Sequence, residues 1–270
     1  MPFRGASAEA FGIVSSELDA AVRPGSDNAA KVGSDLFAVA AVLRSEPGLR
    51  RVATEASHSP ESKASLVRSI FAGKVDDVVL DLVATAAGRR WTTGRDLGLA
   101  LEQLGVVATV RSAGSDTDRL SDELFSVGRL VKDNPSLRDA LSDPARSIDD
   151  KRGLVHNLLE GKALPATIAL VAQALAGTHR TVGVALHEYE RVAAAEHGRR
   201  VAEVRVAHPL TDADRQRLTD ALSRQYDREV HLNVVVDPDV IGGIRVEIGD
   251  DVIDGTVSNR LHDARRQLAG

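Results

Sequence analysis

Apolar residues recur at helical spacing along most of the chain, and the pattern returns after 88 positions. Residues 36–86 align without gaps on residues 124–174, with 16 identities in 51 positions. In each copy an apolar stripe with steps of three or four predicts a helix that a proline then interrupts: Leu36, Val39, Ala40 and Leu43 before Pro47, and Leu124, Val127, Gly128 and Val131 before Pro135. Self-similarity of this length indicates a duplicated helical unit.

A later helix of each copy carries matching start and stop signals. It begins after a serine suited to an N-cap and ends at a glycine suited to a left-handed cap: Ser59 and Gly73 in one copy, Ser147 and Gly161 in the other. Asp150 completes a capping-box pattern with Ser147. The predicted buried faces are Leu66, Val67, Ile70 and Phe71, and Leu154, Val155, Leu158 and Leu159.

Two more helices complete each copy. One is expected over residues 78–87 and 166–176. An outgoing helix follows, with an apolar stripe at helical spacing: Leu97, Leu101, Leu104 and Ala108, and then Leu186, Tyr189 and Ala193. No strand is expected before residue 198.

The tail has a different pattern. Residues 201–207 and 229–236 alternate apolar and polar side chains and are rich in valine, which predicts two strands. Between them Thr211 and Asp214 have capping-box spacing at the start of a helix. Residues 244–248 alternate again. These features predict a small α/β domain.

The stretch 240–261 holds three carboxylates, Asp250, Asp251 and Asp254, beside glycines, and so raises the question of a metal or phosphate loop. Their spacing does not fit a calcium loop, which has acids at alternating positions and a glutamate at position twelve. Gly249 and Asp250 suit a two-residue hairpin turn instead. A closing helix is predicted from apolar steps of four, four, three and four: Ile253, Val257, Leu261, Ala264 and Leu268. The stretch is therefore interpreted as scaffold.

Together these patterns predict a mainly α fold, in which two repeated helical-bundle units are followed by a small α/β C-terminal domain. The predicted bounds are 1–113 for the first helical unit, 114–198 for the second and 199–270 for the α/β domain. Residues 114–116 are the predicted joint between the copies.

Composition narrows the range of functions. A net charge of −5 argues against a binder of nucleic-acid phosphates, and the absence of cysteine excludes disulfides, thiolate metal sites and cysteine nucleophiles. The start of the chain has no apolar core behind its basic residue, so no secretory signal is expected. The longest uncharged apolar run, residues 164–178, falls short of the roughly 20 residues that span a bilayer.

Other candidate chemistry also lacks the required residues. The pairs Gly73–Lys74 and Gly161–Lys162 lack the first glycine and the hydroxyl residue of a phosphate loop. His187–Glu188 lacks a second histidine one helical turn on, where Arg191 stands. The prediction is that the chain has no catalytic, cofactor-binding or metal-binding residue and is not an enzyme.

The tail resembles a known family. Residues 235–238, 241–244, 248–250 and 252–257 give a strand ending at Asp-Pro, a Gly-Gly hairpin and an Asp-Gly helix start. This order is similar to the C-terminal signature of the δ subunit of F-type ATP synthases, whose mitochondrial counterpart is the oligomycin-sensitivity-conferring protein. Further stretches look like the family's entry into that domain and its helical bundle: 204–210, 134–137 and 147–159. Typical members have one bundle, and this chain has about one repeat more.

The resemblance implies a non-catalytic peripheral-stalk, or stator, subunit. In that family the helical bundle receives the N-terminal helices of α subunits, and the C-terminal domain joins the membrane-anchored b-type subunits. The chain would then meet the membrane only through its partners, at the cytoplasmic face of the cell membrane, while ATP synthesis and proton transport belong to other subunits. No cofactor and no nucleic-acid partner is expected.

Two other interpretations stay open. The chain could be a free-standing helical-repeat adaptor with an appended α/β module that binds another partner. Nucleic-acid binding through Gly242–Gly243 is opposed by the acidic charge, and by Arg245 at the position where such a loop needs its second glycine.

Overall fold

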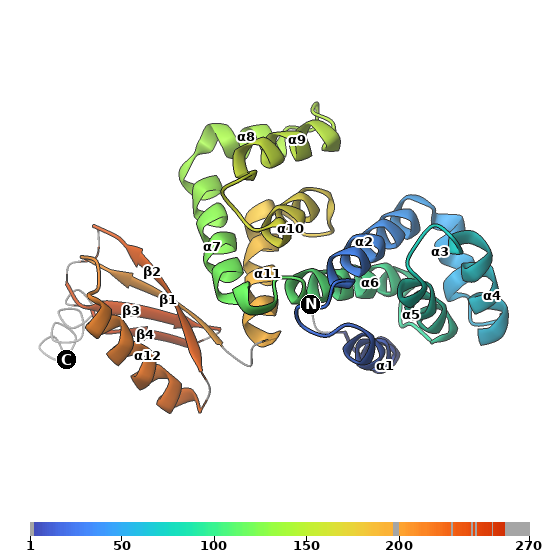
Figure 1. Ribbon diagram of the computed structural model, residues 1–270, viewed down its shortest axis with the longest axis horizontal. Helices are drawn as coiled ribbons and strands as arrows, with labels where there is room; N and C mark the ends of the chain where they lie inside the picture. The colour runs from blue at the N-terminus through green and yellow to red at the C-terminus, as the bar shows by residue number, and fades with distance from the viewer. Residues whose placement is uncertain are drawn as a thin grey trace, which may run out of the picture. The chain divides into compact units, whose positions relative to one another are not determined.

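The computed structural model describes residues 3–196, 200–227, 229–238, 240, 242–249 and 251–256. The chain divides into two compact units, residues 1–192 and 193–270 (Figure 1). The elements in chain order are α1 (Ala6–Ala21), α2 (Ala29–Ser45), α3 (Pro47–Thr54), α4 (Pro60–Phe71), α5 (Asp77–Gly88), α6 (Gly94–Arg111), η1 (Gly114–Asp116), α7 (Thr117–Asp133), α8 (Pro135–Ser142), α9 (Ile148–Leu159), α10 (Pro165–Ala176), α11 (Val182–Glu196), β1 (Arg200–Val206), α12 (Asp212–Tyr226), β2 (Val230–Val236), β3 (Ile244–Ile248) and β4 (Asp251–Asp254). The predicted mainly α fold with a small α/β tail is confirmed.

The helices repeat with the period of the sequence. Each of α7, α8, α9, α10 and α11 begins 88 residues after its counterpart among α2 to α6. The same spacing separates the starts of α1, α6 and α11. Helix α6 therefore ends the first copy and also occupies, in the second copy, the position that α1 has in the first. The predicted division between residues 113 and 114 stays a prediction, because both copies lie mainly in one compact unit.

The predicted helix signals are confirmed in both copies. The Ser59 side chain accepts a hydrogen bond from the Ser62 amide at 3.2 Å, and that of Ser147 accepts one from the Asp150 amide at 3.0 Å. Gly73 and Gly161 follow α4 and α9 with φ values of 72° and 71°. These local contacts satisfy amides that a helix start leaves without partners.

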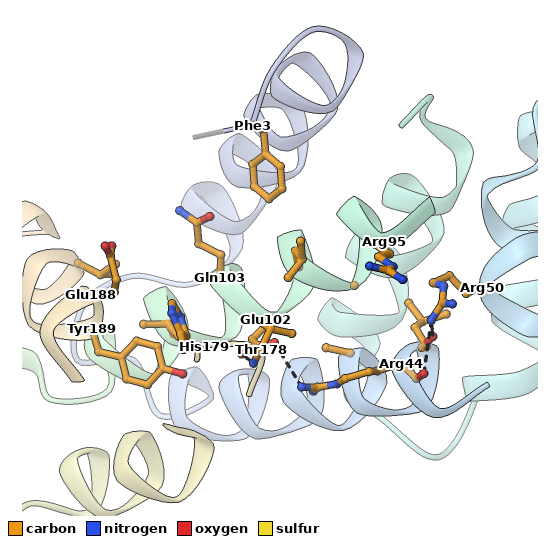
Figure 2. A pocket seen from close by; sticks show the side chains of 16 residues that line it. Phe3, Arg44, Arg50, Arg95, Glu102, Gln103, Thr178, His179, Glu188 and Tyr189 are labelled. Carbon is orange, nitrogen blue, oxygen red and sulfur yellow. Dashed lines mark hydrogen bonds and ion pairs between the residues drawn. The ribbon is translucent and has the colours of Figure 1, made fainter. Parts of the chain in front are cut away.

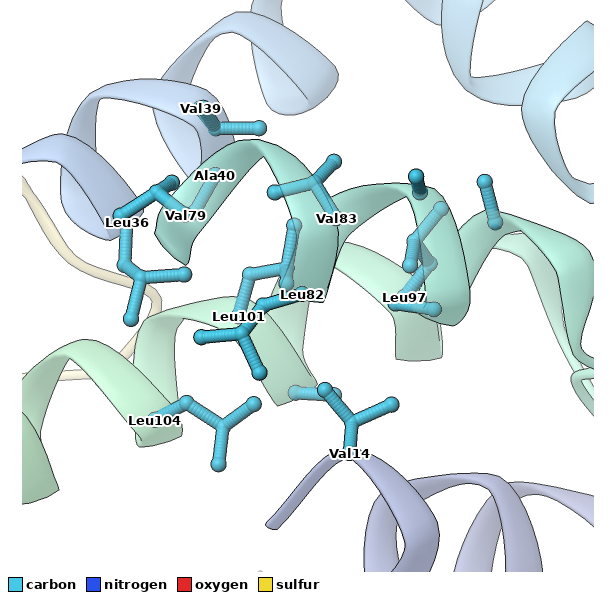
Figure 3. Close-up of a cluster of buried hydrophobic side chains, with 14 of the residues drawn as sticks. Val14, Leu36, Val39, Ala40, Val79, Leu82, Val83, Leu97, Leu101 and Leu104 are labelled. Atoms are coloured by element: carbon cyan, nitrogen blue, oxygen red, sulfur yellow. The ribbon is translucent and has the colours of Figure 1, made fainter. Parts of the chain in front are cut away.

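The first copy has a continuous apolar core (Figure 3). Helix α6 contributes Leu97, Leu101 and Leu104, all fully buried as predicted. Helix α2 packs closely on α6, because a Cβ on Gly33 would lie 2.3 Å from Thr109 Oγ1 and 3.1 Å from the Gly105 carbonyl oxygen. The small residues thus let the two backbones approach each other.

The predicted buried face of the capped helix is partly wrong. Val67, Phe71 and Val155 are buried, but the side chain of Leu158 is 38% exposed. Helix α4 packs on both α3 and α5, whereas α9 packs chiefly on α10, so one side of α9 lacks a neighbouring helix. Whether a side chain of this helix is buried depends on the neighbouring helices that pack against it. The apolar stripe does not show whether such a neighbour is present.

Two buried lysines fall at equivalent positions that the apolar pattern missed. Lys63 and Lys151 are 88 residues apart, and both side chains are buried. The Lys63 ammonium donates a hydrogen bond to the Arg89 carbonyl at 3.4 Å, and burial lowers the pKa of Lys63. A lysine can contribute its apolar stem to a core in this way while its charged end reaches a carbonyl group.

In the described residues, the C-terminal unit contains a four-stranded sheet in the order β2-β1-β3-β4 with α12 along it (Figure 1). Strands β1 and β2 are parallel, as the intervening helix allows, and the other two pairs are antiparallel. The predicted cap of α12 is present, since Thr211 Oγ1 accepts from the Asp214 amide at 3.1 Å. The core is built from alternate strand residues and Leu222 of α12: Ala202, Val204, Val206, Val230, Leu232, Val246 and Ile248.

The glycine- and aspartate-rich stretch forms part of this sheet. Ile248 pairs with Asp251 across a two-residue turn, and Gly249 has a φ of 60°. The Asp254 carboxylate accepts hydrogen bonds from the Thr256 amide and hydroxyl at 3.0 and 2.7 Å. The hairpin prediction is confirmed. Asp250 and the predicted closing helix beyond residue 256 lie outside the described residues.

The contact between α2 and α6 leads to a test. We expect Gly33→Ala to destabilise the protein by about 1–3 kcal/mol, because the added methyl group overpacks the interface. Gly128→Ala in α7 is the matched control, since no atom lies within 4 Å of the added carbon. There the replacement should stabilise the helix by roughly 0.5–1 kcal/mol. Urea unfolding of both variants measures the difference, and equal effects would contradict the close contact.

Candidate partner-binding cleft

The residues that were considered as candidates for metal or phosphate binding lie at helix ends, in a strand and in a helix. Among the described residues, no group of three histidine, aspartate or glutamate side chains could hold a metal ion. Lys74 and Lys162 follow the C-terminal ends of α4 and α9, and Asp251 and Asp254 belong to β4. His187 Nδ1 lies 3.8 Å from the Glu190 carboxylate, and its interaction with that group raises the pKa of His187. Within the described part of the chain, no helix is long and apolar enough to cross a membrane.

The helical unit contains a cleft of about 550 Å³, which we call the inter-copy cleft (Figure 2). Its walls come from α2 and α3 of the first copy, from α6, from the α10–α11 loop and from α11 of the second copy; Phe3 lies over it. The size lies within the range of ligand-binding pockets, roughly 300–1,000 Å³. Since both copies contribute walls, a single copy could not form this cleft.

Helix α6 supplies the floor. Its cleft-lining positions stand 88 residues after the buried face of α1: Arg95, Gly98, Glu102 and Val106 correspond to Ser7, Ala10, Val14 and Leu18. In the first copy, helices α5 and α6 pack against α1. The equivalent face of α6 packs against α10 but is also open to the cleft. Glu102 and Val106 are nevertheless buried, so only the end of this face at Arg95 and Gly98 remains uncovered.

One end of the cleft is cationic. Figure 2 shows Arg50 and Arg95 at this end and Arg44 reaching toward Glu102 at the centre, while Tyr189 and His179 lie at the other end. Arg50 donates hydrogen bonds to the carbonyl groups of Leu43 and Arg44, at 3.0 and 3.3 Å. Within the described part of the chain, neither Arg50 nor Arg95 has an ion-pair partner.

A polar contact joins the two copies at the centre of the cleft. Glu102 is buried, and its Oε1 accepts a hydrogen bond from the Thr178 amide at 3.2 Å. Arg44 donates to the Ala176 carbonyl at 2.7 Å and lies 3.8 Å from the Glu102 carboxylate. Gly177 is required between them, because a Cβ there would lie 2.4 Å from Glu102 Oε1. Side chains of α2 and α6 thus hold the end of α10.

Tyr189 closes the opposite end. Its ring packs edge-on against His179, with ring centroids 5.7 Å apart. Burial, and then the nearby Glu102 carboxylate, raise the pKa of Tyr189. The sequence pattern identified Tyr189 only as an apolar helix position. It missed the cleft, since the lining residues lie far apart along the chain and share no motif.

Comparison with known proteins identifies relatives along the whole chain. The family model for the ATP synthase delta (OSCP) subunit matches residues 107–268. The ATP synthase subunit delta of a Nocardioides species is 56% identical over 268 residues, which cover 99% of this chain and 97% of the relative. The corresponding proteins of Kineococcus radiotolerans and Thermobifida fusca are 44% and 41% identical, over 94% and 91% of this chain and 93% and 92% of their own.

The fold defines a helical-repeat protein with an α/β tail and with a cleft between its two helical copies. The comparisons then place it: the chain belongs to the ATP synthase delta (OSCP) subunit family. The family model matches the second copy and the tail, from within α6 onward. The additional N-terminal copy lies outside that match, but the three relatives share it, since they align over nearly the full length.

The contact around Glu102 predicts the effect of one methyl group. Gly177→Ala should displace the Glu102 carboxylate and remove its hydrogen bond to Thr178, at a cost of about 1.5–3 kcal/mol for a bond to a charged group. Gly183→Ala in α11, which has open space around the added carbon, is the control. Thermal unfolding followed by circular dichroism compares the two. A Gly177→Ala variant as stable as the control would show that the contact contributes nothing.

Proposed function

We propose that this chain is the peripheral-stalk, or stator, subunit of an F-type ATP synthase. The observation that carries the proposal is its similarity, over nearly its whole length, to proteins named ATP synthase subunit delta. In this role the chain holds the catalytic head fixed while the rotor turns.

A structural role needs binding surfaces and no reacting groups. The chain itself performs neither ATP chemistry nor proton transport in this proposal, and it needs no cofactor.

The two compact units suit two sets of partners. We assign the N-terminal helices of the α subunits to the helical unit, because amphipathic helices bind in grooves between helices. The b-type subunits are assigned to the α/β unit, which has its own sheet and core. The chain then acts at the cytoplasmic face of the cell membrane and meets the membrane only through the b-type subunits.

The rival is a helical-repeat adaptor that binds partners unrelated to the synthase. Family membership favours the stator role, and copurification separates the two. A stator subunit fractionates with the synthase and is released when the b-type subunit is missing. An adaptor would keep its own partners in cells that lack the synthase.

The division of partners can be tested on the two units. Residues 1–198 alone should stay helical and bind a peptide from the α-subunit N-terminus, whereas b-type subunits should require residues 200–270. Gly249→Val should weaken b binding only, because a branched residue at a φ of 60° is strained by roughly 1–2 kcal/mol. Gly249→Asn is the control, since asparagine tolerates this conformation better. Loss of both interactions in the valine variant, or b binding without residues 200–270, would contradict the assignment.

The non-catalytic role gives a second test. The purified chain should show no ATP hydrolysis above a mock preparation, and chelation with EDTA should leave its thermal unfolding unchanged. Turnover that a single substitution abolishes would contradict the proposal, as would a fall in Tm on chelation that added metal reverses.

A further inference from the structure

The inter-copy cleft has chemically different ends (Figure 2). At one end Arg50 is half-buried and Arg95 is exposed, and neither has an ion-pair partner among the described residues. At the other end the Tyr189 side chain is only 2% exposed, and its hydroxyl group has no hydrogen-bond partner in the part of the chain that the structure describes. Buried hydroxyl groups are normally hydrogen-bonded, so an unpartnered one that lines a cleft indicates a position for a ligand.

The Tyr189 hydroxyl group is available as a hydrogen-bond donor. Figure 2 shows it pointing from α11 toward the centre of the cleft. Burial, and then the Glu102 carboxylate, raise the pKa of Tyr189, so the hydroxyl group keeps its proton near neutral pH. Glu102 Oε1 already accepts from the Thr178 amide, but a carboxylate can accept about four hydrogen bonds. A ligand hydroxyl group at this end can therefore accept from Tyr189 and donate to Glu102.

The walls between the two ends are mainly apolar, and they include Leu43 of α2, Leu99 of α6 and Val192 of α11. Arg95 and Glu102 stand seven residues apart on α6, which corresponds to about 10 Å along the helix. With its volume of about 550 Å³, the cleft has the size and lining of a small-molecule pocket, in which a few polar groups orient an otherwise apolar ligand.

We propose that the inter-copy cleft binds a small amphipathic anion. Its carboxylate group lies against Arg50 and Arg95, its apolar chain fills the middle of the cleft, and a hydroxyl group at its far end bonds to Tyr189. A medium-chain fatty acid with a terminal hydroxyl group has this chemistry. The inference goes beyond the proposed function and does not depend on it, because the full chain alone contains every wall of the cleft.

Two related acids measure what each end contributes. Isothermal titration calorimetry of the full chain gives the dissociation constants of decanoate and of 10-hydroxydecanoate, which differ only in the terminal hydroxyl group. We expect both acids to bind, and the hydroxylated acid to bind about three- to ten-fold more tightly, the range that one added hydrogen bond gives. Binding of neither acid at millimolar concentration would overturn the proposal, and so would equal affinities for the two.

The Tyr189→Phe variant tests the hydroxyl end of the cleft. It should bind both acids equally, with the affinity that the unchanged chain has for decanoate. Since the Tyr189 hydroxyl group has no partner within the described residues, its removal should not lower the midpoint of thermal unfolding. If the variant still prefers the hydroxylated acid, that hydroxyl group binds elsewhere and the proposal is wrong.

The Arg95→Gln variant tests the cationic end. Arg95 is exposed in the first turn of α6, so the variant should fold. Its affinity for both acids should fall by roughly two- to five-fold, the range of an exposed ion pair. Arg90→Gln is the matched control, because Arg90 is exposed and does not line the cleft. Equal affinities of the two variants would contradict the proposal but not the stator role, which copurification tests.

Discussion

The helical unit depends on one helix that has to be buried on two sides. Helix α6 packs against α1, α2 and α3, which belong to the first copy, and against α7 and α10, which belong to the second. A helix in this situation needs an apolar or small residue on almost every side, which explains its run of buried leucine, valine, alanine and glycine positions. The polar exceptions are engaged. Glu102 bonds to the α10–α11 loop, and Arg111 pairs with Asp19 at 2.6 Å and donates to the Val22 carbonyl at 3.0 Å.

Much of this fold was predictable because its signals are local. Capping serines and terminal glycines act within one turn of the chain, so Ser59, Ser147, Gly73 and Gly161 behave as their positions predict. The hairpin was predictable for the same reason, because its turn depends on the local backbone conformation at Gly249. Burial of a side chain also depends on partners distant in sequence. The pattern therefore overestimated the burial of Leu158 and missed Lys63 and Lys151.

The inter-copy cleft could not be predicted from the sequence, because it also depends on residues that are distant along the chain. Arg44, Glu102 and Tyr189 come from three helices, and each has an ordinary explanation in its own segment. Only the overlap of the two copies at α6 brings them together. The duplication was visible in the sequence, but the shared helix became clear only from the equal spacing of α1, α6 and α11. A surface that arises from duplication carries no motif that a single copy would also show.

Because the two copies share α6, the number of residues in this helix sets how the second copy is rotated relative to the first. Where a flexible linker joins two repeats, an inserted residue changes only the slack between them. Within a continuous helix each residue adds about 100° of rotation and a rise of 1.5 Å. One residue gained or lost in α6 would therefore rotate the second copy about the helix axis relative to the first. The residues that contact Glu102 and Gly33 would then no longer face them. We therefore expect insertions and deletions to occur in the loops around α6, while the length of this 18-residue helix stays constant.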